Sequence, residues 1–348
     1  MSISEIPHLK TRIFDCDSKM VPDFIFKSTN PIILKNLVSD WPIVRESRTS
    51  PKNLASYLKI FYNGKHVSVF QGNPVDNGNY FYSEDISSFN FKTLSLPIDN
   101  VIDSITSSLH DENSIPYYIA SCTIDNFFPN LLKENYINFP PSVTDGFSEN
   151  GPPLINLWLG NKSRSACHFD VPSNIACCIS GKRRFTLLPP SQITNLYPGP
   201  YDLTPGGQVI SMVDFDNPDY TIHPKFERAL ENIQIAELDP GDALFIPSMW
   251  WHQVEALSPI NAMINYWWNS TPRFLGQAKP ALEHSMMTIR NLPKEQKMAW
   301  KELFDYYVFS DNENAINHLP QHSRGILGDL TEIDARRLRA KLLRFLNR

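Results

Sequence analysis

Short apolar runs separated by turn residues dominate the middle of the chain, from about residue 115 to residue 270. Runs of this length between turns predict a β-sandwich or barrel. The turns are Pro189-Pro190, Gly206-Gly207 and Asp239-Pro240-Gly241-Asp242. The long turn-rich stretch 191–232 is expected to shape the mouth of a pocket. The clearest expected strands are LINLWL (154–159), CHFD (167–170), NIACCI (174–179), RFTLLP (184–189), ALFIP (243–247) and AMINYWW (262–268).

The two flanks of this region have other patterns. Before it, we expect a buried strand at 31–34, a helix at 51–60 and a strand at 66–70. After Pro272, apolar residues recur at helical spacing. The helical sets are Leu282, Met286 and Ile289; Trp300, Leu303, Phe304 and Tyr307; and Leu338, Leu342, Phe345 and Leu346. The chain therefore divides into N-terminal α/β elements (1–114), a β-rich core (115–272) and a C-terminal helical segment (273–348).

Composition narrows the class of protein. Hydrophobic residues make up 42% and charged residues 20%, as in an ordinary globular protein. The net charge of -5 provides no general attraction for nucleic acid, although a basic cluster stands near the C-terminus at Arg336, Arg337, Arg339, Lys341, Arg344 and Arg348. The first residues lack a signal-peptide pattern, and no apolar run is long enough to span a membrane.

The cysteines indicate the compartment. The chain has five, an odd number, at Cys16, Cys122, Cys167, Cys177 and Cys178. None forms a CxxC pair, which argues against a disulfide framework and against a cysteine zinc site. We therefore expect a cytoplasmic protein.

The first residues with candidate chemistry are His168 and Asp170. Alternate residues of a strand point to the same face, so an imidazole and a carboxylate at this spacing can bind one metal ion. A His–Asp hydrogen bond on the sheet surface is the alternative. His252 follows in IPSMWWHQVEAL, where a histidine of the apolar core is the alternative.

The combination of the three residues is more specific than each alone. An HxD pair followed about eighty residues later by a histidine in a β-rich region is the 2-His-1-carboxylate pattern of non-haem iron oxygenases. Three ligands on one face leave positions open for a chelating 2-oxo acid and O₂. A 2-oxo acid also needs a cation for its far carboxylate. Arg183 is our candidate, with Ser165 as a second donor, although a solvated turn also explains the KRR sequence.

The quoted motifs resemble a known family. SACHFDVPSNIACCISGKRRFTLLPP, LDPGDALFIPSMWWHQVEAL and NYWW resemble the JmjC-type cupins, and more narrowly the cupin-like group that includes the asparaginyl hydroxylase factor inhibiting HIF. PIILKNLVSDWP and YFYSEDISSFNF resemble bacterial members of that group. The resemblance covers most of the chain. It implies a mainly β fold, a double-stranded β-helix or jelly roll, with N-terminal α/β elements and C-terminal helices.

The resemblance also implies site residues. It makes His168, Asp170 and His252 the Fe(II) ligands and Ser165 a hydroxyl beside 2-oxoglutarate. Further residues implied at the co-substrate pocket are Tyr118, Asn174, Asn265 and Trp267. One position departs from the family, because Arg183 stands where a lysine usually binds the co-substrate.

The implied activity is hydroxylation of a protein or peptide side chain by an Fe(II)- and 2-oxoglutarate-dependent dioxygenase. A small molecule or a tRNA base is the alternative substrate, and demethylation of methyl-lysine is a variant of the same chemistry. A non-catalytic cupin or a metal cupin without 2-oxoglutarate is the alternative to this class of enzyme. In this group, C-terminal helices often form a homodimer; packing of the helices onto the protein's own barrel is the other possibility.

Overall fold

The computed structural model describes residues 8–16, 20–111, 113–310 and 315–347. The chain divides into two compact units, Met1–Ser270 and Thr271–Arg348. The expectations for residues 1–7 and for Arg348 lie outside the described residues. Across the parts that are described, no helix has both the length and the apolar character needed to cross a bilayer.

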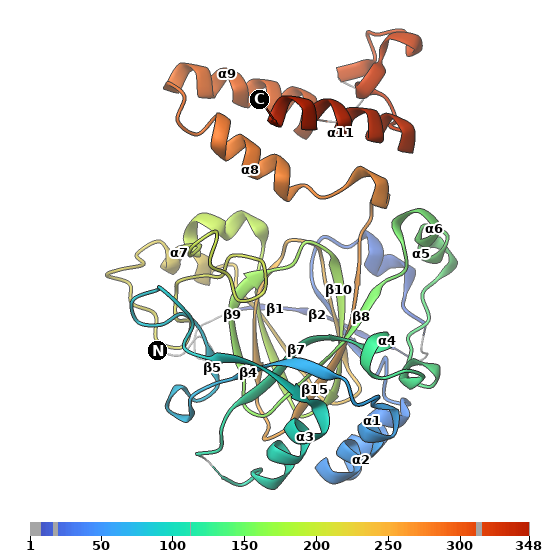
Figure 1. The fold of residues 1–348 in the computed structure, drawn as a ribbon, viewed down its shortest axis with the longest axis vertical. Coiled ribbons are helices and arrows are strands. Elements are labelled where there is room, and N and C mark those ends of the chain that lie inside the picture. Colours follow the sequence, from blue (N-terminus) through green and yellow to red (C-terminus); the bar gives the residue numbers. More distant parts are fainter. Residues whose placement is uncertain (1–7, 17–19, 112, 311–314, 348) are drawn as a thin grey trace. The chain divides into compact units, whose positions relative to one another are not determined.

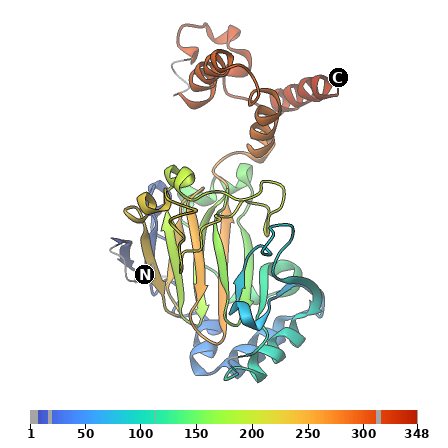
Figure 2. The ribbon, with the colours of Figure 1, turned by 90° about the vertical axis from the view of Figure 1, so that its left-hand side faces the viewer.

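Two mixed sheets form the first unit, and their strands are seen side by side in Figure 2. In the described residues, the smaller sheet has the order β1 (Leu9–Lys10), β12 (Gln234–Leu238), β11 (Arg183–Leu188), β14 (Trp251–Ala256), β9 (Arg164–Phe169) and β5 (Asn79–Tyr80). The larger has the order β2 (Arg12–Asp15), β3 (Ile32–Lys35), β13 (Ala243–Ile246), β10 (Ser173–Ser180), β15 (Asn261–Trp268), β8 (Leu154–Gly160), β7 (Tyr117–Thr123), β4 (His66–Gln71) and β6 (Lys92–Pro97). The expected mainly β fold is therefore confirmed.

The alternation along β10 explains its unbroken apolar sequence. Ile175 and Cys177 face the outer core, whereas Ala176 and Cys178 face the space between the two sheets. A strand that is buried on both faces needs apolar residues at every position. Phe185 of β11 packs against the same inner cluster from the opposite sheet.

Helices cover the outside of the larger sheet. The helices of this unit are α1 (Pro42–Thr49), α2 (Pro51–Phe61), α3 (Ile98–Ser107), α4 (Ile124–Phe127), α5 (Pro141–Thr144), α6 (Phe147–Asn150) and α7 (Phe226–Leu230). Figure 1 shows α1, α2 and α3 gathered on one side of the strands. Leu54 of α2 and Ile102 of α3 are fully or almost fully buried in the outer core. Serine at position 50 caps α2, because its side chain accepts a hydrogen bond from the backbone N–H of Asn53.

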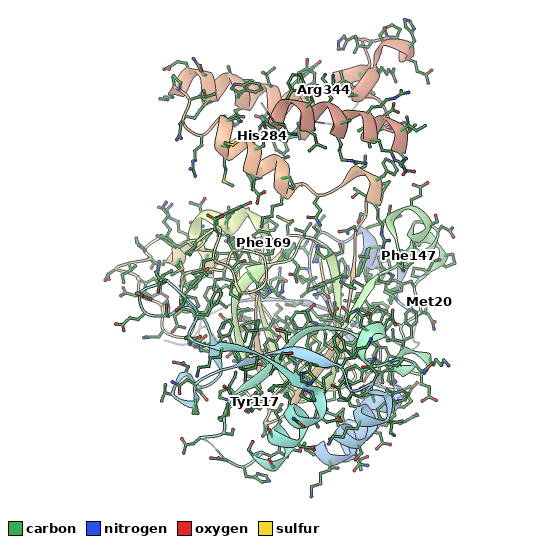
Figure 3. All side chains as sticks on the ribbon, in the orientation of Figure 1. Met20, Tyr117, Phe147, Phe169, His284 and Arg344 are labelled. Atoms are coloured by element: carbon green, nitrogen blue, oxygen red, sulfur yellow. The ribbon has the colours of Figure 1, made fainter. Side chains whose placement is uncertain are left out.

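A third cluster joins the smaller sheet to the segment 191–232. It contains Trp251 from β14, Phe226 from α7 and Phe215. Phe169, labelled in Figure 3, packs on this cluster and meets Trp251 edge to face at 4.9 Å. The turn-rich segment is therefore anchored to the outer face of the strands that carry the histidines.

Most strand predictions were right to within a few residues, but the HxD strand was placed too far along the chain. It runs from Arg164 to Phe169, so Asp170 lies just after its end. Cys122, Cys167, Cys177 and Cys178 are buried.

The second unit consists of helices. Its longer described helices are α8 (Lys279–Thr288), α9 (Lys294–Phe304) with a π-helical turn (Asp305–Phe309), and α11 (Glu332–Leu346). Figure 3 labels His284 on α8 and Arg344 on α11. Thr331 and Asp334 form a capping box at the start of α11. Many apolar side chains of this unit remain exposed, among them Trp300 (45%) and Phe345 (55%).

Candidate active site

Two neighbouring strands bring His168, Asp170 and His252 together. β9 and β14 are antiparallel, and His252 is the register partner of His168. The two imidazole rings lie 4.5 Å apart between centroids. Asp170 Oδ2 lies 3.5 Å from His252 Nε2. One ligand atom from each residue lies within 4.8 Å of the other two, a spacing that one metal ion can bridge.

Backbone carbonyls orient both imidazoles. His168 Nδ1 lies 2.8 Å from the carbonyl oxygen of Ala166, and His252 Nδ1 lies 2.9 Å from that of Trp250. A carbonyl oxygen only accepts, so Nδ1 carries the proton in each ring. Nε2 of each neutral ring then keeps its lone pair for a metal ion.

Electrostatics favour the protonation states that bind metal. Burial and the neighbouring His252 lower the pKa of His168, which keeps this ring neutral. Burial alone would raise the pKa of Asp170. The interactions of its carboxylate with His252 and His168 outweigh burial and lower the pKa of Asp170 instead. Two neutral imidazoles and one carboxylate are a suitable donor set for Fe(II).

The three residues lie in a cavity of about 300 Å³ between the two sheets. All nine side chains expected at the site line this cavity. They are His168, Asp170, His252, Arg183, Ser165, Tyr118, Asn174, Asn265 and Trp267. Pro205, Gly206, Gln208 and Ile210 also line it, so the segment 191–232 contributes to the cavity wall as expected.

Arg183 is a buried cation in this cavity. Its side chain is 1% exposed, and its Nε and Nη2 have no hydrogen-bond partner among the described residues. No salt bridge joins it to a carboxylate in the described part of the chain. Lys182 and Arg184 instead lie at the surface and both pair with Glu237. A buried guanidinium is costly without an anion, so the cavity is suited to an anionic ligand.

Tyr118 stands beside Arg183. Burial raises the pKa of Tyr118 to about 12, and the Arg183 guanidinium moderates this rise. The phenol is therefore protonated and can donate a hydrogen bond. Ser165 Oγ lies 3.5 Å from the carbonyl oxygen of Val254. Its hydroxyl also lines the cavity.

Asparagines form a buried network on the wall of the larger sheet. Asn265 Oδ1 accepts hydrogen bonds from Trp158 Nε1 at 2.7 Å and from Asn156 Nδ2 at 3.4 Å. Asn265 Nδ2 donates to Asn174 Oδ1 at 3.1 Å. Trp267 meets Trp158 edge to face at 5.7 Å, which fixes the wall next to Asp170.

Tyr80 and Trp158 are among the cavity residues that sequence reasoning missed. Alternation along LINLWL could have found Trp158, since it shares a strand face with Asn156. Tyr80 is 4% exposed, its hydroxyl has no partner within the described ranges, and burial raises its pKa. Its two-residue strand is too short to carry a periodic signal.

Two sheets enclosing two histidines and one carboxylate define a cupin-type protein with a candidate mononuclear metal site. Comparison with known families agrees: a model described as "Cupin-like domain" matches residues 18–274, most of the chain. The chain therefore belongs to the cupin-like domain family.

Curated relatives carry several different names. Lysine-specific demethylase JMJ31 of Arabidopsis thaliana is 36% identical over 117 residues, 33% of this chain and 21% of the relative. HSPB1-associated protein 1 of Rattus norvegicus is 31% identical over 259 residues, 70% and 50% of the two chains. tRNA wybutosine-synthesizing protein 5 of Danio rerio is 29% identical over 199 residues, 53% and 56% of the two chains. The match thus spans about half of two of these relatives and about a fifth of the third.

Proposed function

We propose that this chain is an Fe(II)- and 2-oxoglutarate-dependent oxygenase that hydroxylates a side chain of a protein or peptide. The observation that carries the proposal is the buried Arg183 guanidinium in the same cavity as His168, Asp170 and His252. A metal site alone fits many cupins. A metal site with a buried cation and no counter-ion fits a chelating ligand with a second carboxylate.

The residues have separate roles. His168 and His252 would hold Fe(II) through Nε2, and Asp170 through its carboxylate. With both bound, Fe(II) and 2-oxoglutarate supply the oxidation in which O₂, the 2-oxo acid and a substrate C–H yield succinate, CO₂ and C–OH. Arg183 and Tyr118 would bind the far carboxylate of 2-oxoglutarate, and the Ser165 hydroxyl would donate a further hydrogen bond to it.

The rest of the cavity orients ligands and limits water. Asn174 and Asn265 offer amide groups that their own hydrogen bonds hold in place. Trp267 and Trp158 form a rigid apolar wall. The volume of about 300 Å³ is at the low end for ligand pockets, so it suits the co-substrate plus a group of side-chain size.

A polypeptide substrate is our first choice, by resemblance to the asparaginyl hydroxylase group and because the net charge of -5 disfavours RNA. One relative is named for lysine demethylation and another for tRNA wybutosine synthesis. A methyl-lysine peptide and a tRNA are therefore the alternative substrates to screen, together with small molecules.

The test is anaerobic titration of the Fe(II)-loaded protein with 2-oxoglutarate. We expect a weak visible charge-transfer band, followed by succinate release when air is admitted. His168→Ala and Asp170→Ala should abolish both signals. Arg183→Gln should remove 2-oxoglutarate binding, whereas Arg184→Gln, one residue away on the surface, should retain it.

Two results would contradict the proposal. Fe(II) binding without any band or succinate at saturating 2-oxoglutarate would favour a metal cupin that does not use this co-substrate. No Fe(II) binding at all would favour a non-catalytic cupin.

A further inference from the structure

Asp170 lies outside the strand that precedes it. β9 ends at Phe169, and the ladder with β14 pairs Phe169 with Trp251 and His168 with His252. No ladder pairing of this kind includes Asp170 in the described residues. A carboxylate just after a strand end has a mobile backbone unless another segment holds it. The structure must therefore hold Asp170 by other contacts.

The turn before β14 provides them. We call residues 247–250 the strap. It closes on itself through the hydrogen bond from Trp250 N–H to the carbonyl oxygen of Pro247, at 3.3 Å. Met249 N–H donates to the carbonyl oxygen of Asp170 at 2.8 Å. Ser248 Oγ donates to the carbonyl oxygen of Val171 at 2.5 Å. The strap thus holds the backbone carbonyls of two consecutive residues, Asp170 and Val171.

The conformation of the strap has a cost. Met249 has a φ of +66°, the left-handed region, and it is the third residue of a turn where glycine is favoured. An L-residue adopts this region only at a cost in free energy, because its Cβ approaches the following carbonyl oxygen. Packing of the side chain does not explain it, since Met249 is 39% exposed. This conformation directs the Met249 N–H toward the carbonyl oxygen of Asp170.

The strap also connects two of the three candidate ligands. His252 follows Met249 by three residues, and Trp250 between them accepts the Nδ1–H of His252 through its carbonyl oxygen. One turn therefore sets the backbone of Asp170 and the ring orientation of His252. Small outer contacts of this kind govern metal affinity by orienting ligands.

We propose that Ser248 and Met249 are positioning residues that hold Asp170 in place for metal binding. The inference rests on the metal site of the proposed function and not on the identity of the co-substrate. Neither Ser248 nor Met249 is among the residues that line the cavity; they act through the backbone of Asp170 and Val171.

The test compares Ser248→Thr with Ser248→Val in the full chain. Threonine and valine have the same shape, but only threonine retains the hydroxyl donor. The probe is Co(II), titrated without oxygen and followed through its visible d–d absorption. We expect Ser248→Val to weaken Co(II) binding by about tenfold and to change the band shape, and Ser248→Thr to match the wild type.

Two further variants separate positioning from general stability. Met249→Gly keeps the N–H and relieves the left-handed conformation, so it should bind Co(II) as the wild type does and unfold at an equal or higher temperature. Thr106→Val removes a hydroxyl-to-carbonyl bond in α3 and should leave Co(II) binding unchanged.

The outcomes are distinct. Equal Co(II) affinity and band shape for Ser248→Val and Ser248→Thr would overturn the positioning role while leaving the metal site intact. Strong loss of Co(II) affinity in Met249→Gly would also overturn it, because the retained N–H would then be insufficient. Absence of Co(II) binding in the wild type would overturn the metal site and this inference together.

Discussion

His168 and His252 are register partners on antiparallel strands, and their rings lie 4.5 Å apart at an angle of 52°. Both Nδ1 atoms lie within hydrogen-bonding distance of backbone carbonyls two residues earlier. The ladder between β9 and β14 therefore positions both imidazoles before any ligand arrives. A site assembled by the sheet itself should bind metal without a large rearrangement.

Metal should stabilise the wild type but not His252→Ala. A ligand present at a hundred times its dissociation constant stabilises the folded state by about 2.7 kcal/mol. The measurement is thermal unfolding with and without Fe(II) or Co(II), under anaerobic conditions. His284→Ala, an exposed histidine of α8, is the control and should retain the full shift. An equal shift in both variants would contradict the assigned ligand.

Replacing Arg183 by methionine should stabilise the ligand-free protein while abolishing binding of 2-oxoglutarate. A buried charge without a counter-ion destabilises the folded state, and a flexible apolar side chain can fill the same space. We expect a gain of about 1–3 kcal/mol in urea unfolding, in line with other replacements of buried charges. A loss of stability would mean that Arg183 has a structural role in the ligand-free protein.

Asn265→Leu should destabilise the protein strongly. The change removes the acceptor for Trp158 and Asn156 and the donor to Asn174, all within the wall of the larger sheet. Leaving buried polar groups without partners costs about 1–3 kcal/mol for each group. Urea unfolding measures the loss. Asn232→Ala, which removes an exposed hydrogen bond to Arg228 just after α7, should change the free energy of unfolding by less than about 0.5 kcal/mol.

Gly181→Ala should disturb the turn that leads into Arg183. Gly181 has a φ of +70°, and an added Cβ would lie 2.4 Å from the carbonyl oxygen of Ile260. Both the conformation and the contact oppose a side chain, so we expect a loss of about 2 kcal/mol or more together with weaker 2-oxoglutarate binding. Gly206→Ala, where no atom lies within 4 Å of the added Cβ, is the matched control for stability.

The C-terminal helices should form a homodimer. Leu342 is 49% exposed and Phe345 is 55% exposed on α11, and Trp300 is 45% exposed on α9. Apolar side chains in such number are costly in water unless another surface covers them. Light scattering should give twice the chain mass for the wild type and for Lys341→Asp, but the monomer mass for Leu342→Asp with Phe345→Asp. A monomeric wild type would refute this expectation.

The sequence by itself determined the fold class and the composition of the site. Alternation and turn residues located most of the strands, because period and turn chemistry are local properties that a single strand or turn carries. The spacing of His168, Asp170 and His252 indicated the metal chemistry for the same reason: HxD on a strand is a local pattern, and few classes of protein combine it with a later histidine.

Only the tertiary structure decided how these parts meet. The register of His252 against His168 depends on the pairing of strands more than eighty residues apart, which no local pattern encodes. The same holds for the two Arg183 nitrogens that have no hydrogen-bond partner in the described part of the chain, and for the place of Tyr80 in the cavity wall. The contribution of Met249 to the strap was invisible in the sequence as well, because it is a backbone hydrogen bond to Asp170 in which the Met249 side chain takes no part. Sequence patterns report side-chain chemistry and the local spacing of apolar residues. Strand register, buried polar atoms without a hydrogen-bond partner, and backbone contacts between distant segments arise only when those segments pack together.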